Sequence, residues 1–292
     1  MQPPAAAFLT SNERFQRIAE GNGGIVGKGG YGTVYQGFDH VLKEQCTIKR
    51  QKADEPTAVR ETAFYTMMRA WPHPNILKMT GLFVQEFGGV KSLYICTETC
   101  ADSVWRKLAI DDNANRRRDI LLLQHQPQHL MLGIARGAAH LHRVGIAHGD
   151  LSLSNVLLTW DGEVKVCDFG TAHPASCHLT ADKFCATYIR PPEAVVGSPA
   201  KGQAVDKWAV GICGMACFTL TAPTFPLETM NNASDEEWRV HAFLAAAALL
   251  PIITEDNWPG HAVLPKWSAL RQRYSAVSPK DQLDSYMAGL PE

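Results

Sequence analysis

Short apolar runs separated by polar turns fill the first hundred residues of the chain, and longer runs with helical spacing follow them. Strand-like segments begin at Arg14 and recur at residues 41–42, 46–49, 76–84 and 93–98. One helical segment, opened by Pro56, interrupts them, and helical spacing dominates from about Asp102. The pattern predicts an α+β protein, in which a small, mostly antiparallel sheet with one helix is followed by a mostly helical part.

The segment 148–170 combines two short apolar strands with polar side chains suited to metal binding. The turn Trp160-Asp161-Gly162 is of the Asp-Gly kind that is typical of a β-hairpin. This hairpin places Asn155 before its first strand and Asp168 after its second, and their oxygens suit Mg²⁺. Asp150 is expected beside the metal, as the acceptor of a hydroxyl proton in phosphoryl transfer. A surface loop is the alternative for the Asp-Phe-Gly sequence taken alone.

A glycine-rich segment, Gly27-Lys28-Gly29-Gly30-Tyr31-Gly32-Thr33-Val34, lies in the first half of the chain. Such glycines let backbone amides approach phosphates, with Val34 placed to cover a flat base, although a glycine-rich hairpin turn is the alternative. Lys49 ends the following β-prone run, and a lysine after this loop favours phosphate binding over a solvated side chain.

Pro56 opens the helical segment that carries Arg60 and Glu61. Glu61 is placed to reach Lys49 as a buried ion pair, and a solvent-facing glutamate is the alternative. Residues 97–100, Thr-Glu-Thr-Cys, connect to the helical half, where free backbone groups are suited to binding an adenine edge.

Composition limits the cellular compartments and the binding partners that are expected. The 292 residues carry a net charge of -1, which gives no general attraction to nucleic acid or to a membrane. Eight cysteines without a Cys-x-x-Cys pair favour reduced thiols in the cytoplasm or nucleus. The apolar run Val240–Ile253 is short and contains a proline, so we predict a buried helix rather than a membrane span. The 11 histidines suggest no zinc site.

The order of these motifs resembles the eukaryotic protein kinase domain, and most closely its cyclin-dependent branch. Three segments carry the likeness to that branch: Pro56–Glu61, similar to the helix that cyclins grip; Arg190 before Pro-Pro-Glu; and Asn257–Gly260 followed by Leu264–Trp267. The resemblance implies a two-lobed fold. Its expected parts are a flexible leader at 1–13, an N-lobe at about 14–98, a hinge at about 98–102 and a C-lobe at about 103–292.

The resemblance also implies roles for individual residues, with ATP and Mg²⁺ as cofactors. The residues expected to bind ATP are Gly27, Lys28, Gly29, Gly32, Val34, Lys49, Thr97 (as gatekeeper), Glu98 and Cys100. The residues expected in catalysis are Asp150 (as base), Lys49, Glu61, Asn155 and Ser152, and the expected metal ligands are Asn155 and Asp168. Asp206 is expected to anchor the catalytic loop through backbone hydrogen bonds. The implied partners are a protein substrate and a cyclin-like protein at the Pro56–Glu61 helix, with no nucleic acid and no membrane.

The chain departs from the family pattern in the catalytic loop and at its end. Gly149 stands where the family has an arginine, and Ser152 where it has a lysine that steadies the transferring phosphate. Losing a cation at the transition state lowers the rate steeply, so activity is low or Ser152 shares this role with another group. The family also has a further helix whose arginine pairs with Glu193. The sequence ends at Glu292 without it, so Glu193 is solvated or paired locally, or the chain is marginally stable or incomplete.

An active protein serine/threonine kinase is the leading interpretation. A pseudokinase that binds nucleotide or a cyclin-like partner is the alternative, motivated by Gly149, Ser152 and the missing helix. A small-molecule phosphotransferase is a minor alternative, because such enzymes also have His-Gly-Asp followed four residues later by Asn. The kinase-like helix, the Pro-Pro-Glu segment and the Asn257–Gly260 stretch argue against it.

The activation loop yields the first testable prediction. Cyclin-dependent kinases hold a phosphothreonine with three arginines, of which only Arg60 remains here, because Gly149 and His173 stand at the other two positions. The phosphosite falls on or near Asp182, with Thr180 close by. We therefore expect activity that does not depend strongly on activation-loop phosphorylation. A large rise in activity on stoichiometric phosphorylation of Thr180 would contradict this hypothesis.

Overall fold

The computed structural model describes residues 13–18, 24–29, 32–109, 127–179, 189–195 and 200–219, together with Asp256. The chain divides into two compact units. The first unit comprises residues 1–102 and 157–172, and the second comprises residues 103–156 and 173–292. The segment 157–172, which contains Asp168, thus makes its contacts with the first unit. The domain boundaries inferred from sequence stay a prediction.

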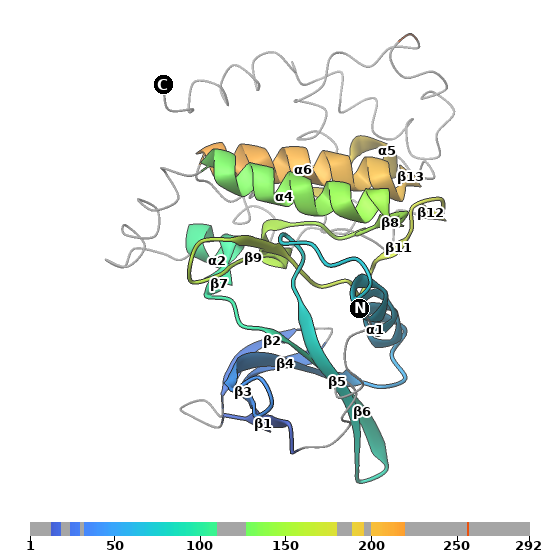
Figure 1. Cartoon of the computed structure of the whole chain (residues 1–292). Coiled ribbons are helices and arrows are strands. Elements are labelled where there is room, and N and C mark those ends of the chain that lie inside the picture. The colour runs from blue at the N-terminus through green and yellow to red at the C-terminus, as the bar shows by residue number, and fades with distance from the viewer. Residues whose placement is uncertain are drawn as a thin grey trace, which may run out of the picture. The chain divides into compact units, whose positions relative to one another are not determined.

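A six-stranded antiparallel sheet forms the first unit (Figure 1). Its strands are β1 (Phe15–Arg17), β2 (Ile25–Gly29), β3 (Gly32–Asp39), β4 (Glu44–Lys52), β5 (Met79–Phe87) and β6 (Val90–Glu98). The order is β1-β3-β4-β6-β5, and β2 pairs with β3. Strand β4 alternates between faces as the period of two requires, with Cys46 and Ile48 buried on one face. On that face they join a core of Phe15, Tyr35, Phe83 and Cys96.

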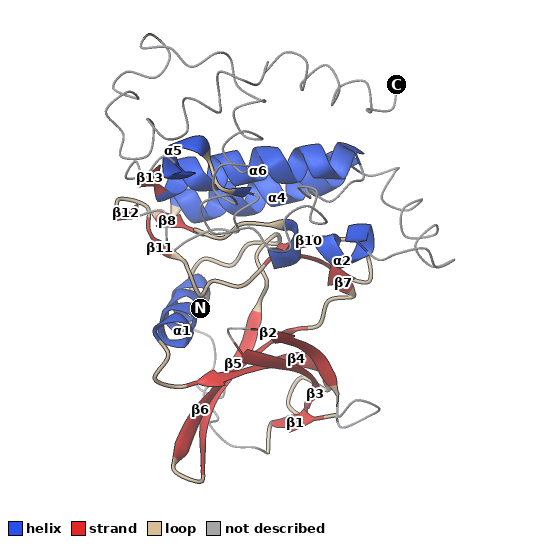
Figure 2. Cartoon of the chain, turned by 180° about the vertical axis from the view of Figure 1, so that it is seen from behind, coloured by secondary structure: helices blue, strands red, loops and turns tan. Residues whose placement is uncertain are grey.

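Helix α1 (Pro56–Met68) belongs to the first unit, and Figure 2 shows it in blue beside the red strands. Pro56 takes the first helical position, where its missing amide hydrogen costs nothing. The buried residues recur at helical spacing along one face: Ala58, Glu61, Phe64, Tyr65 and Met68. The predicted α+β class, with an antiparallel sheet and one helix in the first part, is confirmed.

The predicted strand at Val41–Leu42 is wrong, because these residues form the turn between β3 and β4. The Asp39 carboxylate accepts hydrogen bonds from the Val41 and Leu42 amides at 3.0 and 3.1 Å. Lys43 then adopts a left-handed backbone with φ of 58°. A side chain that bonds to nearby backbone amides favours a turn over a strand.

The hairpin predicted near Trp160 is confirmed. Strands β9 (Val156–Leu158) and β10 (Val164–Val166) are neighbours in a small sheet that also contains β7 (Asp102–Ser103). Gly162 in the turn has φ of 84°, a conformation that favours glycine. Its amide donates to the Thr159 carbonyl at 3.0 Å.

Helices α4 (Pro127–Arg143) and α6 (Gly202–Thr219) lie side by side in the second unit (Figure 1). The short elements described in this unit are α2 (Val104–Ala109), β8 (Ile146–Ala147), η2 (Leu153–Asn155), β11 (His173–Pro174), β12 (His178–Leu179), α5 (Pro192–Val195) and β13 (Ala200–Lys201). Strands β8 and β11 pair, as do β12 and β13. Cys213 and Cys217 are fully buried in α6, as expected of core residues, and burial raises the pKa of both thiols.

Several predictions from the sequence concern residues outside the described part of the chain. They include residues 1–12 of the leader predicted at 1–13, Thr180, Asp182, the run Val240–Ile253, and the segments Asn257–Gly260 and Leu264–Trp267. The residues after Thr219 also lie outside it, apart from Asp256, so the prediction for a partner of Glu193 stays open. Within the described part, no helix combines the length and the apolarity needed to cross a bilayer.

The buried pair Arg14–Asp39 provides a stability prediction. Arg14 donates three hydrogen bonds of 2.8 to 3.1 Å to the Asp39 carboxylate, and both side chains are buried. We expect Asp39→Asn to lower the free energy of unfolding by about 3–5 kcal/mol, because it leaves the guanidinium buried without a carboxylate. Urea unfolding measures the loss, and Asp54→Asn on an exposed turn is the matched control.

The same pair predicts a pH dependence. Although burial opposes it, the hydrogen bonds from Arg14 and from the Leu42 and Val41 amides lower the pKa of Asp39 below its ordinary value. Its stabilisation is therefore fully present above about pH 3.9 and is lost as the pH falls through the lowered pKa. The stability difference between wild type and Asp39→Asn should shrink over that acid range. A difference that stays constant there would contradict the assignment.

Candidate active site

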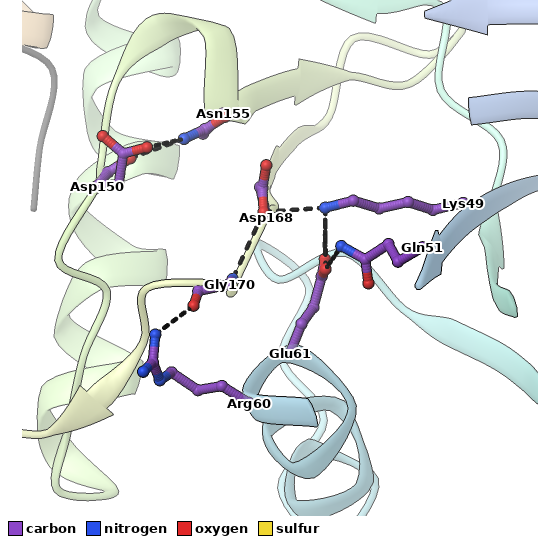
Figure 3. A network of polar contacts seen from close by, with 8 residues as sticks. All are labelled: Lys49, Gln51, Arg60, Glu61, Asp150, Asn155, Asp168 and Gly170. Atoms are coloured by element: carbon purple, nitrogen blue, oxygen red, sulfur yellow. Dashed lines mark hydrogen bonds and ion pairs between the residues drawn. The ribbon is translucent and has the colours of Figure 1, made fainter. Parts of the chain in front are cut away.

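The Lys49 ammonium lies between two carboxylates of the first unit (Figure 3). Its Nζ is 2.9 Å from Glu61 Oε2 and 3.0 Å from Asp168 Oδ1. Lys49 comes from β4, Glu61 from α1 and Asp168 from the segment after β10. The buried ion pair between Lys49 and Glu61, one of two alternatives left by the sequence, is present. The structure adds the second carboxylate.

Burial and charge act in opposite directions on Lys49. Burial alone would lower its pKa, but the carboxylates of Glu61 and Asp168 raise the pKa to about 12. Lys49 therefore carries its charge at any physiological pH. Glu61 is only 2% exposed, whereas Asp168 is 29% exposed. Of the two carboxylates, Asp168 is the one that retains access to solvent.

The backbone of Asp168 is left-handed, with φ of 61°. Non-glycine residues rarely adopt this conformation, and strain of this kind concentrates at functional sites. The next residue, Phe169, is fully buried and stacks on Phe64 of α1 with ring centroids 3.8 Å apart. It also meets the Tyr65 ring edge-on at 5.2 Å. This aromatic packing holds the strained segment against α1.

The glycine-rich segment forms an antiparallel hairpin of β2 and β3. In its register Gly27 faces Val34, Lys28 faces Thr33, and Gly29 faces Gly32; Gly30 and Tyr31 lie outside the described residues. Val34 in turn faces Lys49 across β3 and β4, which places the hairpin beside the lysine. A Cβ at Gly32 would lie 2.2 Å from the Arg50 carbonyl oxygen, whereas one at Gly27 or Gly29 would meet no atom within 4 Å.

The segment expected to bind adenine follows β6. Thr97 is buried, and the Glu98 carboxylate accepts a hydrogen bond from the Lys78 amide at 2.7 Å. None of the hydrogen bonds among the described residues uses the Cys100 backbone amide or carbonyl. Burial, with the nearby Glu98, raises the pKa of the Cys100 thiol to about 12, so it stays protonated at neutral pH.

Asp150 and Asn155 lie together in the second unit (Figure 3). Asn155 Nδ2 donates to the Asp150 carbonyl at 2.7 Å and to Asp150 Oδ2 at 3.3 Å. The Asp150 amide in turn bonds to His148 Nδ1 at 3.2 Å. Because the Asn155 amide nitrogen serves the loop, its oxygen is the atom suited to a metal ion.

Asp206 of α6 anchors the same loop, as predicted. Its fully buried carboxylate accepts the His148 amide at 2.8 Å and the Gly149 amide at 3.0 Å. Gly149 has φ of 79°, in the left-handed region that favours glycine. Glycine is therefore suited to the backbone conformation in which the loop presents this amide to Asp206.

Ser152 is 2% exposed, and its Oγ lies 2.7 Å from Ser154 Oγ. The hydroxyl is thus engaged within the loop, and its expected part in catalysis stays a prediction. Sequence reasoning missed three further contacts. Gln51 Nε2 donates to Glu61 Oε2 at 3.0 Å, His142 Nε2 lies 2.8 Å from Asp206 Oδ2, and Arg60 Nη1 donates to the Gly170 carbonyl at 2.7 Å. Of these, only Gln51 had a local signal, because it lies two residues after Lys49 on the same strand face.

Comparison with known proteins agrees with this fold and these motifs. The family model for the protein kinase domain matches residues 21–274. The chain therefore belongs to the protein kinase family, as predicted. Membership of this family implies ATP as the phosphoryl donor.

The relatives narrow the class within that family. The chain is 29% identical over 255 residues to cyclin-dependent kinase 11.1 of Caenorhabditis elegans, covering 84% of this chain and 33% of that protein. It is 27% identical over 266 residues to mouse cyclin-dependent kinase 10, covering 87% of this chain and 68% of the mouse protein. It is 28% identical over 246 residues to the Schizosaccharomyces pombe serine/threonine-protein kinase ppk23, covering 82% of this chain and 56% of the yeast protein. The predicted similarity to the cyclin-dependent branch is confirmed.

The chain spans between a third and about two thirds of the length of these relatives. Among solved structures, a chain of the yeast RNA Pol II CTD kinase CTDK-1 complex is similar, with a TM-score of 0.65 and 20% identity. The alignment covers 100% of this chain and 84% of that one. At this identity the likeness concerns the fold, and it agrees with the predicted kinase-like fold.

The backbone of Gly149 provides a prediction. We expect Gly149→Ala to lower the free energy of unfolding by about 1–2 kcal/mol, because a Cβ disfavours a left-handed backbone. Gly211→Ala in α6 is the control: a Cβ there meets no atom within 4 Å, and alanine in a helix should stabilise by about 0.5–1 kcal/mol. Urea unfolding of both variants measures the two effects. A Gly149→Ala protein as stable as wild type would contradict the account of Gly149.

Proposed function

We propose that the chain is a protein serine/threonine kinase of the cyclin-dependent type, which transfers the γ-phosphate of Mg-ATP to a hydroxyl group on a protein. The observation that carries the proposal is the position of Lys49, held between Glu61 and Asp168 at 2.9 and 3.0 Å. A lysine fixed in this way offers a directed positive charge to phosphate oxygens. The names of the relatives support the serine/threonine class and the cyclin-dependent type.

The residues present fit ATP and Mg²⁺. A Cβ at Gly27 or Gly29 would meet no atom within 4 Å, so the space beside this backbone is open. Open space next to glycine lets phosphates approach the backbone closely. In the part of the chain that the structure describes, no three His, Cys, Asp or Glu side chains gather into a metal site. Mg²⁺ instead prefers one or two protein oxygens together with phosphate oxygens and water, and Asp168 and Asn155 offer such oxygens.

Each proposed catalytic residue has a distinct task. When bound, Mg²⁺ neutralises charge on the phosphates and orients them for in-line transfer. Lys49 holds the α- and β-phosphates, and Glu61 fixes its direction. Asp150 accepts the proton of the substrate hydroxyl, and the Asn155 amide, bonded to Asp150 Oδ2, orients this carboxylate. Asp206 keeps the loop in place through the His148 and Gly149 amides.

Nucleotide contacts are proposed for the other predicted residues. Gly32, Lys28 and the exposed strand β2 lie on the hairpin that would cover the phosphates. The backbone amide and carbonyl of Cys100 bond to no described residue, so they suit hydrogen bonds to an adenine edge. Thr97 and Glu98 end strand β6 just before Cys100. Thr97 is proposed as the gatekeeper at the back of the nucleotide site, and Glu98 as part of the connection that binds the adenine. Val34 is only partly buried beside Lys49, a position that suits contact with the base.

A cyclin-like partner is proposed for the outward face of α1. Val59 on α1 and Trp71 just beyond it are large apolar side chains that are 57% and 51% exposed. The relatives include proteins named as cyclin-dependent kinases. A partner covering Val59 would bury this face while leaving the inward contact of Glu61 intact.

The cytoplasm or nucleus is the proposed compartment. The seven cysteines within the described ranges are all free thiols, which suits a reducing environment. The pseudokinase alternative keeps one specific observation in its favour, namely the buried Ser152 hydroxyl where the family has a lysine. Mg-ATP-dependent phosphorylation of a protein substrate separates the kinase from the pseudokinase.

Substitution of the proposed base tests the function. We expect Asp150→Asn to lower kcat by at least about a hundredfold, because the amide cannot accept the hydroxyl proton. The measurement is Mg-ATP-dependent phosphorylation of a generic protein substrate, with and without a cyclin-like protein. Asp161→Asn, on the exposed hairpin turn, is the matched control and should retain full activity.

Thermal unfolding with Mg-ATP completes this test. A nucleotide at a hundredfold its Kd should stabilise the fold by about 2.7 kcal/mol. Stabilisation without turnover in the wild type, with and without the partner, would identify a pseudokinase. Turnover that survives in Asp150→Asn would remove the proposed base. If a cyclin-like protein stimulates the wild type, Val59→Asp should abolish that stimulation.

A further inference from the structure

Arg60 is the one arginine left at the three positions that the family uses to hold a phosphorylated activation loop, since Gly149 and His173 stand at the other two. Its guanidinium has a partner within the first unit. Arg60 Nη1 donates to the Gly170 carbonyl oxygen at 2.7 Å, as Figure 3 shows. The arginine thus binds the backbone of the segment that carries Asp168.

Gly170 lies close to the first turn of α1. A Cβ built at Gly170 would meet Thr57 Cβ and Asp168 Oδ1, each at 3.5 Å. The Gly170 amide also points towards Asp168 Oδ1 at 3.5 Å. Helix α1 and the segment 168–170 are therefore already close to each other, and the Arg60 hydrogen bond joins them.

Two neighbouring residues of α1 hold the two ends of this segment. Glu61 forms an ion pair with Lys49, which also forms one with Asp168. Arg60 donates a hydrogen bond directly to the Gly170 carbonyl. Between them, Phe169 stacks on Phe64. Asp168 has a left-handed backbone that the surrounding contacts must maintain, and the Arg60 hydrogen bond lies two residues from that strain. A charged donor strengthens a hydrogen bond to a carbonyl.

We propose that Arg60 is a positioning residue, which fixes Asp168 for metal binding by holding the Gly170 carbonyl, and that it does so without a phosphate group. The inference rests on the proposed function and deepens it. A phosphate is not needed to orient this guanidinium, because the carbonyl already does so. The contact lies wholly within the first unit, and it is present without a phosphate group.

The experiment compares Arg60→Gln with wild type before and after phosphatase treatment of the full-length chain. Loss of the contact should lower kcat by about tenfold to a hundredfold and raise the Mg²⁺ concentration for half-maximal activity. The loss should be the same in both phosphorylation states. Arg50→Gln is the matched control, because Arg50 is an exposed arginine of β4 that bonds to Ser92 Oγ at 3.2 Å.

Two outcomes overturn the inference. A loss seen only before phosphatase treatment means that Arg60 acts on a phosphate, and no loss beyond that of Arg50→Gln means that the contact has no role. If the wild type transfers no phosphate at all, the proposed function fails separately. Mg²⁺-dependent ATP binding then decides: weaker binding in Arg60→Gln, but not in Arg50→Gln, supports the inference, and equal binding overturns it.

Discussion

The pairing of one partly buried ammonium with two carboxylates joins three separate parts of the first unit. Lys49 and Asp168 are 119 residues apart in sequence, and Glu61 comes from a helix between them. Taking Glu61 out of water is costly and raises the pKa of its carboxyl, and the bonds from Lys49 and Gln51 compensate for part of this cost. The sheet, helix α1 and the end of the β9–β10 hairpin must all be in place before this compensation exists.

The sequence predicted best what depends on local chemistry. The hairpin around Asp161 follows from a short-range turn signal, and the buried face of α1 follows from its apolar spacing. The strand predicted at Val41–Leu42 is wrong because the apolar pair is typical of a strand, whereas the buried Asp39 carboxylate accepts hydrogen bonds from both amides and so fixes a turn. Whether Glu61 faces Lys49 or solvent stayed open, because only packing decides it. The Arg60–Gly170 contact, 110 residues apart, has no local signal at all.

The substitution at Gly149 shows why a missing side chain has two readings. Judged by sequence, it removes a cation that the family uses for regulation. Judged by geometry, it gives the loop a residue at ease with φ of 79°, where the amide reaches Asp206. The backbone contact needs no side chain, so anchoring of the loop by Asp206 and regulation by an arginine are separable properties. At this position the contact with Asp206 is present, and the arginine that the family uses for regulation is absent.

The balance of charge around Lys49 has a consequence for nucleotide binding. One ammonium and two carboxylates leave a net negative charge on this group, and the strongly anionic triphosphate is not attracted to it as a whole. A divalent cation at the proposed site would reverse this balance, since Asp168 remains partly exposed while Glu61 bonds to Lys49. Because Ser152 and Gly149 add no positive charge to the catalytic loop, we expect the proposed activity to depend on the metal more than that of a kinase with the usual arginine and lysine. We therefore expect metal and nucleotide to bind together. The orientation of Asp168 by its neighbours on α1 should then affect the binding of both.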